Sequence, residues 1–206
     1  APYDVANFAG YNLPISVTNY LSPTGEYDST AFGPQAHNEA MLGLNAAGEM
    51  VDGTAVTWLQ NAQTNGTWGS GDADGISLNV LSQLGEDIPF GVLANLHATQ
   101  QTDGGWGFGV PASANSTAEV VLGLVQYGDN PFAPAWSVVL DGKLQNPADV
   151  VLAQQAANGC WPNQFGPGDD PYATTDAILL LMANPEWAEG ISFLEYELHA
   201  PIVSKE

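Results

Sequence analysis

The chain has 206 residues, 45% of them hydrophobic, and carries 23 acidic residues against two lysines, for a formal net charge of -21. This length and hydrophobic content predict one globular domain with its own core. The charge excludes the basic surface that nucleic acid or anionic lipid head groups need, and no apolar run reaches the ~18 residues of a membrane span.

The N-terminal residues 1–34 differ in composition from the rest of the chain. They contain four prolines, and apolar and polar residues alternate over 15–21. Prolines at this density disfavour helices, and alternation is typical of a strand. We therefore expect an extended N-terminal arm with one strand, followed by a repeat domain over 35–200 and a tail over 201–206.

From residue 35 onward the hydrophobic pattern is helical. Apolar residues recur at helical spacing and stop at glycine-rich turns. The predicted helices cover 36–48, 54–63, 74–84, 89–100, 115–127, 148–155, 174–182 and 186–198. The stretch 129–147 is an insertion rich in proline and glycine, with a short helix expected over 136–140.

One turn motif, a glutamine followed by Gly-x-Trp, occurs three times between these helices. Its copies begin at Gln63, Gln101 and Gln155 and end at Trp68, Trp106 and Trp161. The helix before each turn is amphipathic, whereas the helix after it is apolar on nearly all sides. Alternation of half-exposed and enclosed helices predicts a curved or closed double layer of helical hairpins.

These turns, together with the Asn-Ser-Thr-Ala helix start at 115–118, resemble the QW repeats of the prenyltransferase and squalene-cyclase superfamily over residues 35–187. The resemblance implies an all-α fold, here a partial α/α toroid of about four hairpins. It also implies that Gln63, Gln101 and Gln155 bond to the start of the next helix. Trp68, Trp106 and Trp161 would stack on these glutamines, so that all six residues act as structural clips.

The sequence departs from the family wherever the family performs chemistry. The Asp-x-Asp-Asp acid motif of the cyclases is not found, the lone Cys160 lacks the Asp and His partners of a zinc site, and diphosphate-binding arginines are missing. We therefore expect no enzymatic activity and no required cofactor. The leading hypothesis is a non-catalytic structural or interaction module that associates with itself or with other surface proteins.

The alternative is a binder of a small ligand, isoprenoid or cobalamin-like, or an enzyme related to the terpene cyclases. Its site would be an aromatic-lined hollow formed by Trp68, Trp106, Phe108 and Trp161.

A secreted or cell-surface location is expected for either function. The chain opens with Ala-Pro-Tyr and no methionine, as after signal-peptide removal, and glycosylation patterns begin at Asn65 and Asn115.

Carboxylates in the turns are the remaining candidates for a site. Asp72, Asp74, Asp169 and Asp170 could hold calcium, which prefers closely spaced carboxylates in loops. They could equally cap the helices that follow, because acidic residues stabilise helix starts.

Three further carboxylates lie on the helices expected to form the inner layer. Glu39 and Glu119 occupy matching positions on two of these helices, and Asp176 lies near the corresponding place on a third. Exposure at a rim is the interpretation we favour, because burial of an unpaired charge is costly. Paired carboxylates of glycosidase type are the alternative.

Overall fold

The computed structural model describes residues 4–27, 34–109 and 111–184. Its helices are α1 (Leu13–Thr18), α2 (Pro34–Ala46), α3 (Gly53–Ala62), α4 (Gly71–Leu84), α5 (Val92–Thr99), α6 (Ala114–Tyr127), α7 (Pro147–Ala153) and α8 (Pro171–Ala183). The strands β1 (Val138–Leu140) and β2 (Lys143–Gln145) pair antiparallel, and 3-10 turns cover Val5–Asn7 and Pro134–Trp136. The described chain is therefore mainly helical, as expected. None of the helices in these ranges is long and apolar enough to cross a membrane.

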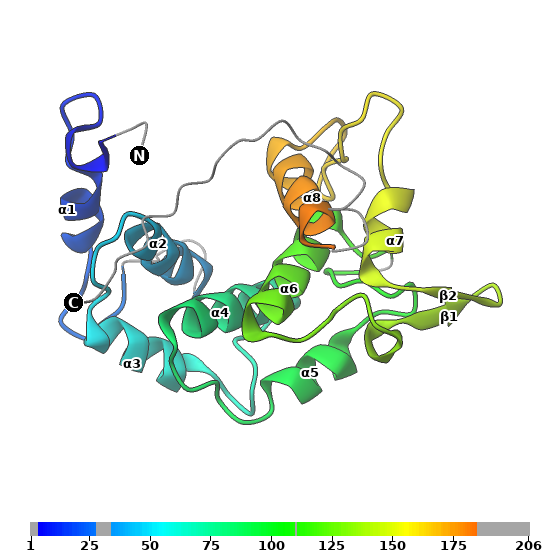
Figure 1. Ribbon diagram of the computed structural model, residues 1–206, viewed down its shortest axis with the longest axis horizontal. Helices are drawn as coiled ribbons and strands as arrows, with labels where there is room; N and C mark the ends of the chain where they lie inside the picture. The colour runs from blue at the N-terminus through cyan, green and yellow to red at the C-terminus, as the bar shows by residue number, and fades with distance from the viewer. Residues whose placement is uncertain (1–3, 28–33, 110, 185–206) are drawn as a thin grey trace, which may run out of the picture.

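The even-numbered helices form an inner row and the odd-numbered helices an outer one. Along the inner row α2 packs on α4, α4 on α6, and α6 on α8. The helices α3, α5 and α7 lie on the outer, convex side of this row. Figure 1 shows the rows bent into an arc with α1 and α2 at one end and α8 at the other. Each outer helix and the inner helix after it make one hairpin, so the arc contains four hairpins in succession.

The seam between α4 and α6 depends on two glycines. A methyl group on Gly75 would lie 2.6 Å from the backbone of Glu119, and one on Gly123 would lie 2.3 Å from the carbonyl oxygen of Gly75. Both distances are shorter than any carbon contact, so only glycine allows the two helices to approach this closely. The seam holds the two central inner helices backbone to backbone.

The core consists of two clusters that share α6. The larger cluster contains residues of α2, α3, α4, α5 and α6, and the smaller one contains residues of α6, α7 and α8. The prediction that helices after the turns are enclosed is confirmed for α4 and α6, whose apolar residues are mostly buried. It is wrong for α8, where Ile178, Leu179 and Met182 are 46%, 44% and 46% exposed, because none of the described helices follows α8 in the inner row.

The N-terminal arm is not extended. The segment expected as a strand contains α1, because Asn12 caps the amide of Ile15 and Pro14 occupies the first turn, where proline favours a helix. These local signals outweigh the alternation on which the prediction rested. Residues 4–27 therefore supply the outer helix of the first hairpin rather than a separate arm.

The insertion also differs from its prediction. Residues 138–140 form strand β1 instead of a helix, and Asp141 and Gly142, both with positive φ, make the two-residue turn to β2. An Asp-Gly pair is a typical hairpin turn, and it is the signal that the prediction of a helix missed. The predicted helix over 186–198 and the tail over 201–206 lie outside the described residues.

Candidate functional site

The tryptophans of the three turns all make the same pair of hydrogen bonds. The indole Nε1 atoms of Trp68, Trp106 and Trp161 donate to the carbonyl oxygens of Leu59, Leu96 and Val151, at 2.8, 3.0 and 2.6 Å. The backbone N–H groups of the same tryptophans donate to Asp74 Oδ1, Thr117 Oγ1 and Thr174 Oγ1, at 2.5, 3.1 and 3.0 Å. The acceptor is each time the fourth residue of the following inner helix. Each turn is thus tied to the outer helix before it and the inner helix after it.

The glutamines do not play the part that the resemblance implies. Gln63 Oε1 accepts from the amide of Gly66, Gln101 Nε2 donates to the carbonyl of Gly107, and Gln155 Nε2 donates to that of Gly159. All three bonds close the turn itself and do not reach the start of the next helix. The side chain at the fourth helical position makes that link, because the peptide N–H beside the indole points toward it.

A fourth, degenerate copy of the clip lies before α2. The buried Tyr27 stands in the tryptophan's place, and its backbone N–H donates to Nδ1 of His37, the fourth residue of α2, at 3.0 Å. Nε2 of His37 lies 3.1 Å from the carbonyl of Ala55, so the imidazole is neutral with its proton on Nε2. Burial lowers the pKa of His37, which keeps it neutral. This copy lacks both the Gln and the Trp of the motif, so the sequence pattern could not reveal it.

The predicted aromatic hollow is not formed by the residues proposed for it. The rings of Trp68, Trp106 and Trp161 lie in the core, at 7%, 1% and 1% exposure. Phe108 is exposed and packs beside Phe165, with ring centroids 6.0 Å apart. The three indoles therefore pack between helices and do not line a hollow.

Most of the candidate calcium ligands are occupied by the protein itself. Asp74 accepts from Thr67, Trp68 and Asn95, while Asp170 caps α8 through the amides of Tyr172 and Ala173. Asp169 Oδ2 accepts from the side-chain Nδ2 of Asn158 at 2.7 Å. No group of three or more His, Cys, Asp or Glu side chains in the described ranges is arranged to hold a metal ion. Capping accounts for the position of Asp170, whereas Asp74 ties the preceding turn to α4, whose N-cap is Ser70.

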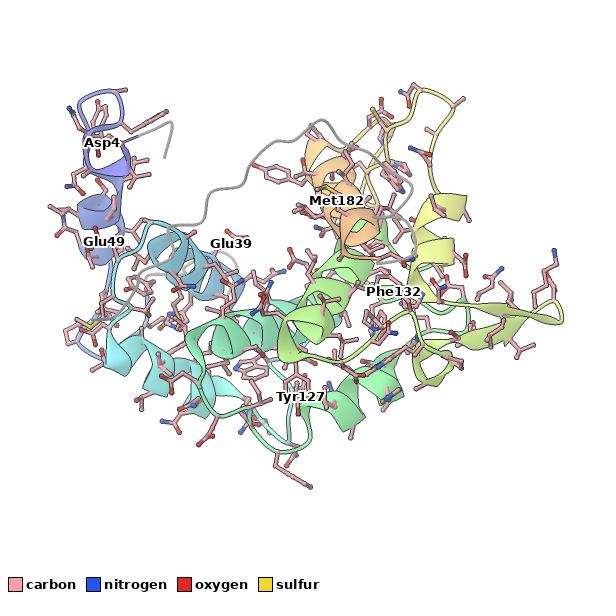
Figure 2. The ribbon with its side chains drawn as sticks, viewed as in Figure 1. Asp4, Glu39, Glu49, Tyr127, Phe132 and Met182 are labelled. Atoms are coloured by element: carbon pink, nitrogen blue, oxygen red, sulfur yellow. The ribbon has the colours of Figure 1, made fainter. Side chains whose placement is uncertain are left out.

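A hollow of about 480 Å³ opens between α2, α6, α8 and the loop before α8. It is lined by Gln35, Ala36, Glu39, Asn115, Glu119, Gln164, Phe165, Asp170, Tyr172 and Asp176. We call it the acidic hollow. Figure 2 shows Glu39 on the side of α2 that faces the inside of the arc.

Every inner helix contributes a carboxylate to this region. Glu39, Glu119 and Asp176 are the sixth residues of α2, α6 and α8, so the matching positions seen in the sequence do converge. The fourth, Asp72 at the start of α4, is buried and accepts hydrogen bonds from the side chains of Gln35 and Ser116. Glu39 lies exposed at the rim as expected, whereas Glu119 and Asp176 are half-buried.

The proximity of these groups changes their protonation. Burial, and then the charges of Asp176, Asp72 and Glu39, raise the pKa of Glu119 from 4.5 to about 8. Burial also raises the pKa of Asp72 and that of Asp176, although the amide of Asn115, which donates to Asp176, opposes the shift. Glu119 is therefore mostly protonated at neutral pH, beside carboxylates whose charge is not balanced by any lysine or arginine among the lining residues.

Sequence alone missed Asp72 as a member of this cluster, because its place in the motif Asp72-x-Asp74 points to a turn. The site thus consists of polar and acidic groups, with the two exposed aromatic side chains of Phe165 and Tyr172 at its edge.

In comparisons with known proteins, no family model, curated protein or solved structure matches this chain.

Proposed function

We propose that this chain is a non-catalytic interaction module, built on a partial α/α toroid, that binds a cationic group of its ligand in the acidic hollow. The observation that carries this proposal is the convergence of Glu39, Glu119 and Asp176, from three inner helices, on one hollow without a lysine or arginine among its lining residues. The buried Asp72 of α4 adds a further charge that acts on Glu119. Like charges gathered in this way destabilise the fold, and a bound cation would relieve the repulsion.

An organic cation fits the hollow better than a metal ion does. The described carboxylates do not form a metal-binding group, whereas the hollow also offers the side-chain amides of Gln35, Asn115 and Gln164 as hydrogen-bond partners. The rings of Phe165 and Tyr172 add faces on which a guanidinium or ammonium group can stack. We therefore favour an arginine-like or amine-bearing ligand.

Protonation couples binding to pH. A cation would bind best when Glu119 is ionised, and ionisation requires loss of the proton held with a pKa of about 8. Because only the ionised fraction is competent, the affinity should fall by up to about fiftyfold from pH 8 to pH 6. Release of a proton on binding is the signature of this mechanism.

The test is isothermal titration at low ionic strength with N-acetyl-arginine amide, whose guanidinium stays charged throughout this pH range. The neutral isostere N-acetyl-citrulline amide is the ligand control. We expect Glu119→Gln and Asp176→Asn to weaken binding by about tenfold or more, with little change for Glu86→Gln, an exposed glutamate after α4. Equal losses in all three variants, or no binding of the arginine probe, would refute the proposal. Tight calcium binding would instead support the metal hypothesis.

The proposal also includes a partial α/α toroid as the architecture and a secreted or cell-surface location. The arc of four hairpins supports a partial toroid. The acidic, cation-poor composition supports a secreted or cell-surface location, which fractionation of the producing cells would test.

A second candidate function is general acid catalysis. Glu119, protonated at neutral pH, shares the hollow with Asp176, and a neutral carboxylic acid beside another carboxylate is the pairing that glycoside-cleaving enzymes use. Hydrolysis of an oligosaccharide by the wild-type chain, abolished in Glu119→Gln and retained in Glu86→Gln, would favour an enzyme over the interaction module.

A further inference from the structure

The four inner helices stack in one common register. Three seams between neighbouring inner helices show this register. In the first, Asn38, the fifth residue of α2, donates to Ser77, the seventh residue of α4, at 2.7 Å. Gly75, the fifth residue of α4, meets Gly123, the tenth of α6. The third seam packs Ala118 and Val121, the fifth and eighth residues of α6, in one cluster with the third, seventh and tenth residues of α8.

The register defines two faces on every inner helix. We call the face with the fifth, eighth and twelfth residues the front face, because it meets the next inner helix. The face with the third, seventh and tenth residues meets the preceding inner helix, and we call it the rear face. Each internal seam of the arc is thus one front face packed on one rear face.

Among the described residues, no further inner helix covers the front face of α8. The eighth residues of α2, α4 and α6 are Met41, Leu78 and Val121, and all three are 0% exposed. The eighth residue of α8 is Ile178, which is 46% exposed, and the twelfth is Met182, exposed to the same extent. At the eighth position a large apolar side chain therefore stands exposed where the next inner helix covers it elsewhere in the arc. The twelfth position is exposed in α6 as well, where Val125 is 38% exposed.

The rear face of α2 is made of small residues, of which Ala36 and Ala40 are half-buried and Gly43 is exposed. Its third, seventh and tenth residues are Ala36, Ala40 and Gly43, and a methyl group on Gly43 would meet nothing within 4 Å. Ala36 and Ala40 line a groove of about 430 Å³ together with apolar side chains of α1 and the turn after it. The helices α1 and α2, which line this groove, lie at the end of the arc away from α8 (Figure 1).

We propose that copies of this chain associate head to tail, with the front face of α8 of one copy seated in the groove between α1 and α2 of the next. The two open faces are the two halves of the seam that the chain forms three times internally. Their shapes are complementary, because α8 presents isoleucine and methionine where α2 presents alanine and glycine. Within one chain the acidic hollow separates α2 from α8, so these halves meet only between copies.

A contact of this kind joins two different surfaces, so it either closes into a ring or continues as a filament. The apolar side chains of α8 would become buried, and the packing of the inner row would continue across the copies. Figure 2 shows Met182 on α8, at the end of the arc that would enter the groove. The inference does not depend on cation binding: of the residues on the two faces, Ala36 alone also lines the acidic hollow, and its methyl group carries no charge.

Light scattering coupled to size exclusion, over about a hundredfold range of concentration, gives the oligomeric state. We expect a discrete oligomer or a filament, and a dissociation constant raised by about tenfold or more in Ile178→Asp and in Ala40→Gln. Phe90→Asp is the control, because Phe90 is fully exposed and lies on neither face. A chain that stays monomeric at every concentration would overturn the proposal.

Cysteine pairing identifies the two surfaces. In a Cys160→Ser background, Met182→Cys and Gly43→Cys are prepared as separate proteins and then mixed under mild oxidation. Head-to-tail contact predicts interchain disulfides in the mixture and little in either protein alone. Disulfides formed by Met182→Cys alone would show a symmetric contact, and their absence from the mixture would show that α8 is covered by something else; either result refutes the proposal.

Discussion

Replacing Glu119 by glutamine should change how the stability of the protein depends on pH. The folded protein holds the Glu119 proton with a pKa of about 8, whereas the unfolded chain releases it near 4.5. Between these values the folded state binds more protons, so the free energy of unfolding falls as the pH rises. Glutamine has the shape of the protonated acid and does not titrate, so Glu119→Gln removes this contribution.

The two pKa values set the size of the effect. Proton linkage gives a loss of about 3–4 kcal/mol for the wild type between pH 5 and pH 8. Because the carboxyl group borders an open hollow, solvent screening reduces this figure, and we expect about 2 kcal/mol. The raised pKa values of Asp72 and Asp176 act in the same direction, but they are present in both proteins and largely cancel in the comparison.

Urea unfolding, followed by tryptophan fluorescence at about pH 5 and pH 8, measures this difference. Relative to the wild type, Glu119→Gln should gain about 2 kcal/mol on going from the lower to the higher pH. Glu86→Gln, with the same change of charge at an exposed site, should run parallel to the wild type. If Glu119→Gln also runs parallel, the carboxyl group does not hold its proton at neutral pH and the electrostatic account of the hollow is wrong.

Three further predictions concern the scaffold. Gly75→Ala forces a methyl group into the backbone of α6 and should lower the free energy of unfolding by about 2–3 kcal/mol, whereas Gly53→Ala, with open space around it, should change it little; thermal denaturation compares the two. Thr174→Val leaves the amide of Trp161 without its acceptor and should cost about 1–3 kcal/mol in urea unfolding, while Thr174→Ser should recover most of the loss. His37 has a lowered pKa, so its neutral form is favoured in the folded state and stability should fall as the pH drops below about 6.5; a His37→Asn variant should lack this acid-sensitive step, and an unchanged step would refute the assignment.

Much of the helical pattern could be predicted from the sequence because hydrophobic periodicity and glycine stops act locally. The six predicted helices that flank the three turns all exist, with ends shifted by a few residues. For example, α5 begins at Val92, after Gly91 with its positive φ, rather than at 89. The failures came from competing local signals. Asn12 and Pro14 start a helix within an alternating segment, and the Asp141-Gly142 turn makes a hairpin within an expected helix.

Only part of the candidate site could be predicted from the sequence. The matching positions of Glu39, Glu119 and Asp176 were visible in the sequence, since they follow from the repeat. Their burial depends on how closely α4 and α6 approach and on the loop before α8, neither of which periodicity reports. The indoles show the reverse case: sequence identified Trp68 and Trp106 as clips, but an aromatic hollow could be dismissed only once their rings were seen to lie in the core.

The two hydrophobic clusters on either side of α6 have a consequence for how the molecule opens. The smaller cluster relies on alanines such as Ala118, Ala173 and Ala177, together with a few larger residues, so the hairpin of α7 and α8 contributes little buried apolar area. In a stacked array each hairpin is stabilised mainly by its neighbours, and among the described hairpins that of α7 and α8 has one inner-row neighbour fewer in the monomer. Amide protons of α8 should therefore exchange with solvent through a local opening well below the global unfolding free energy, while those of α4 exchange only when the whole array unfolds.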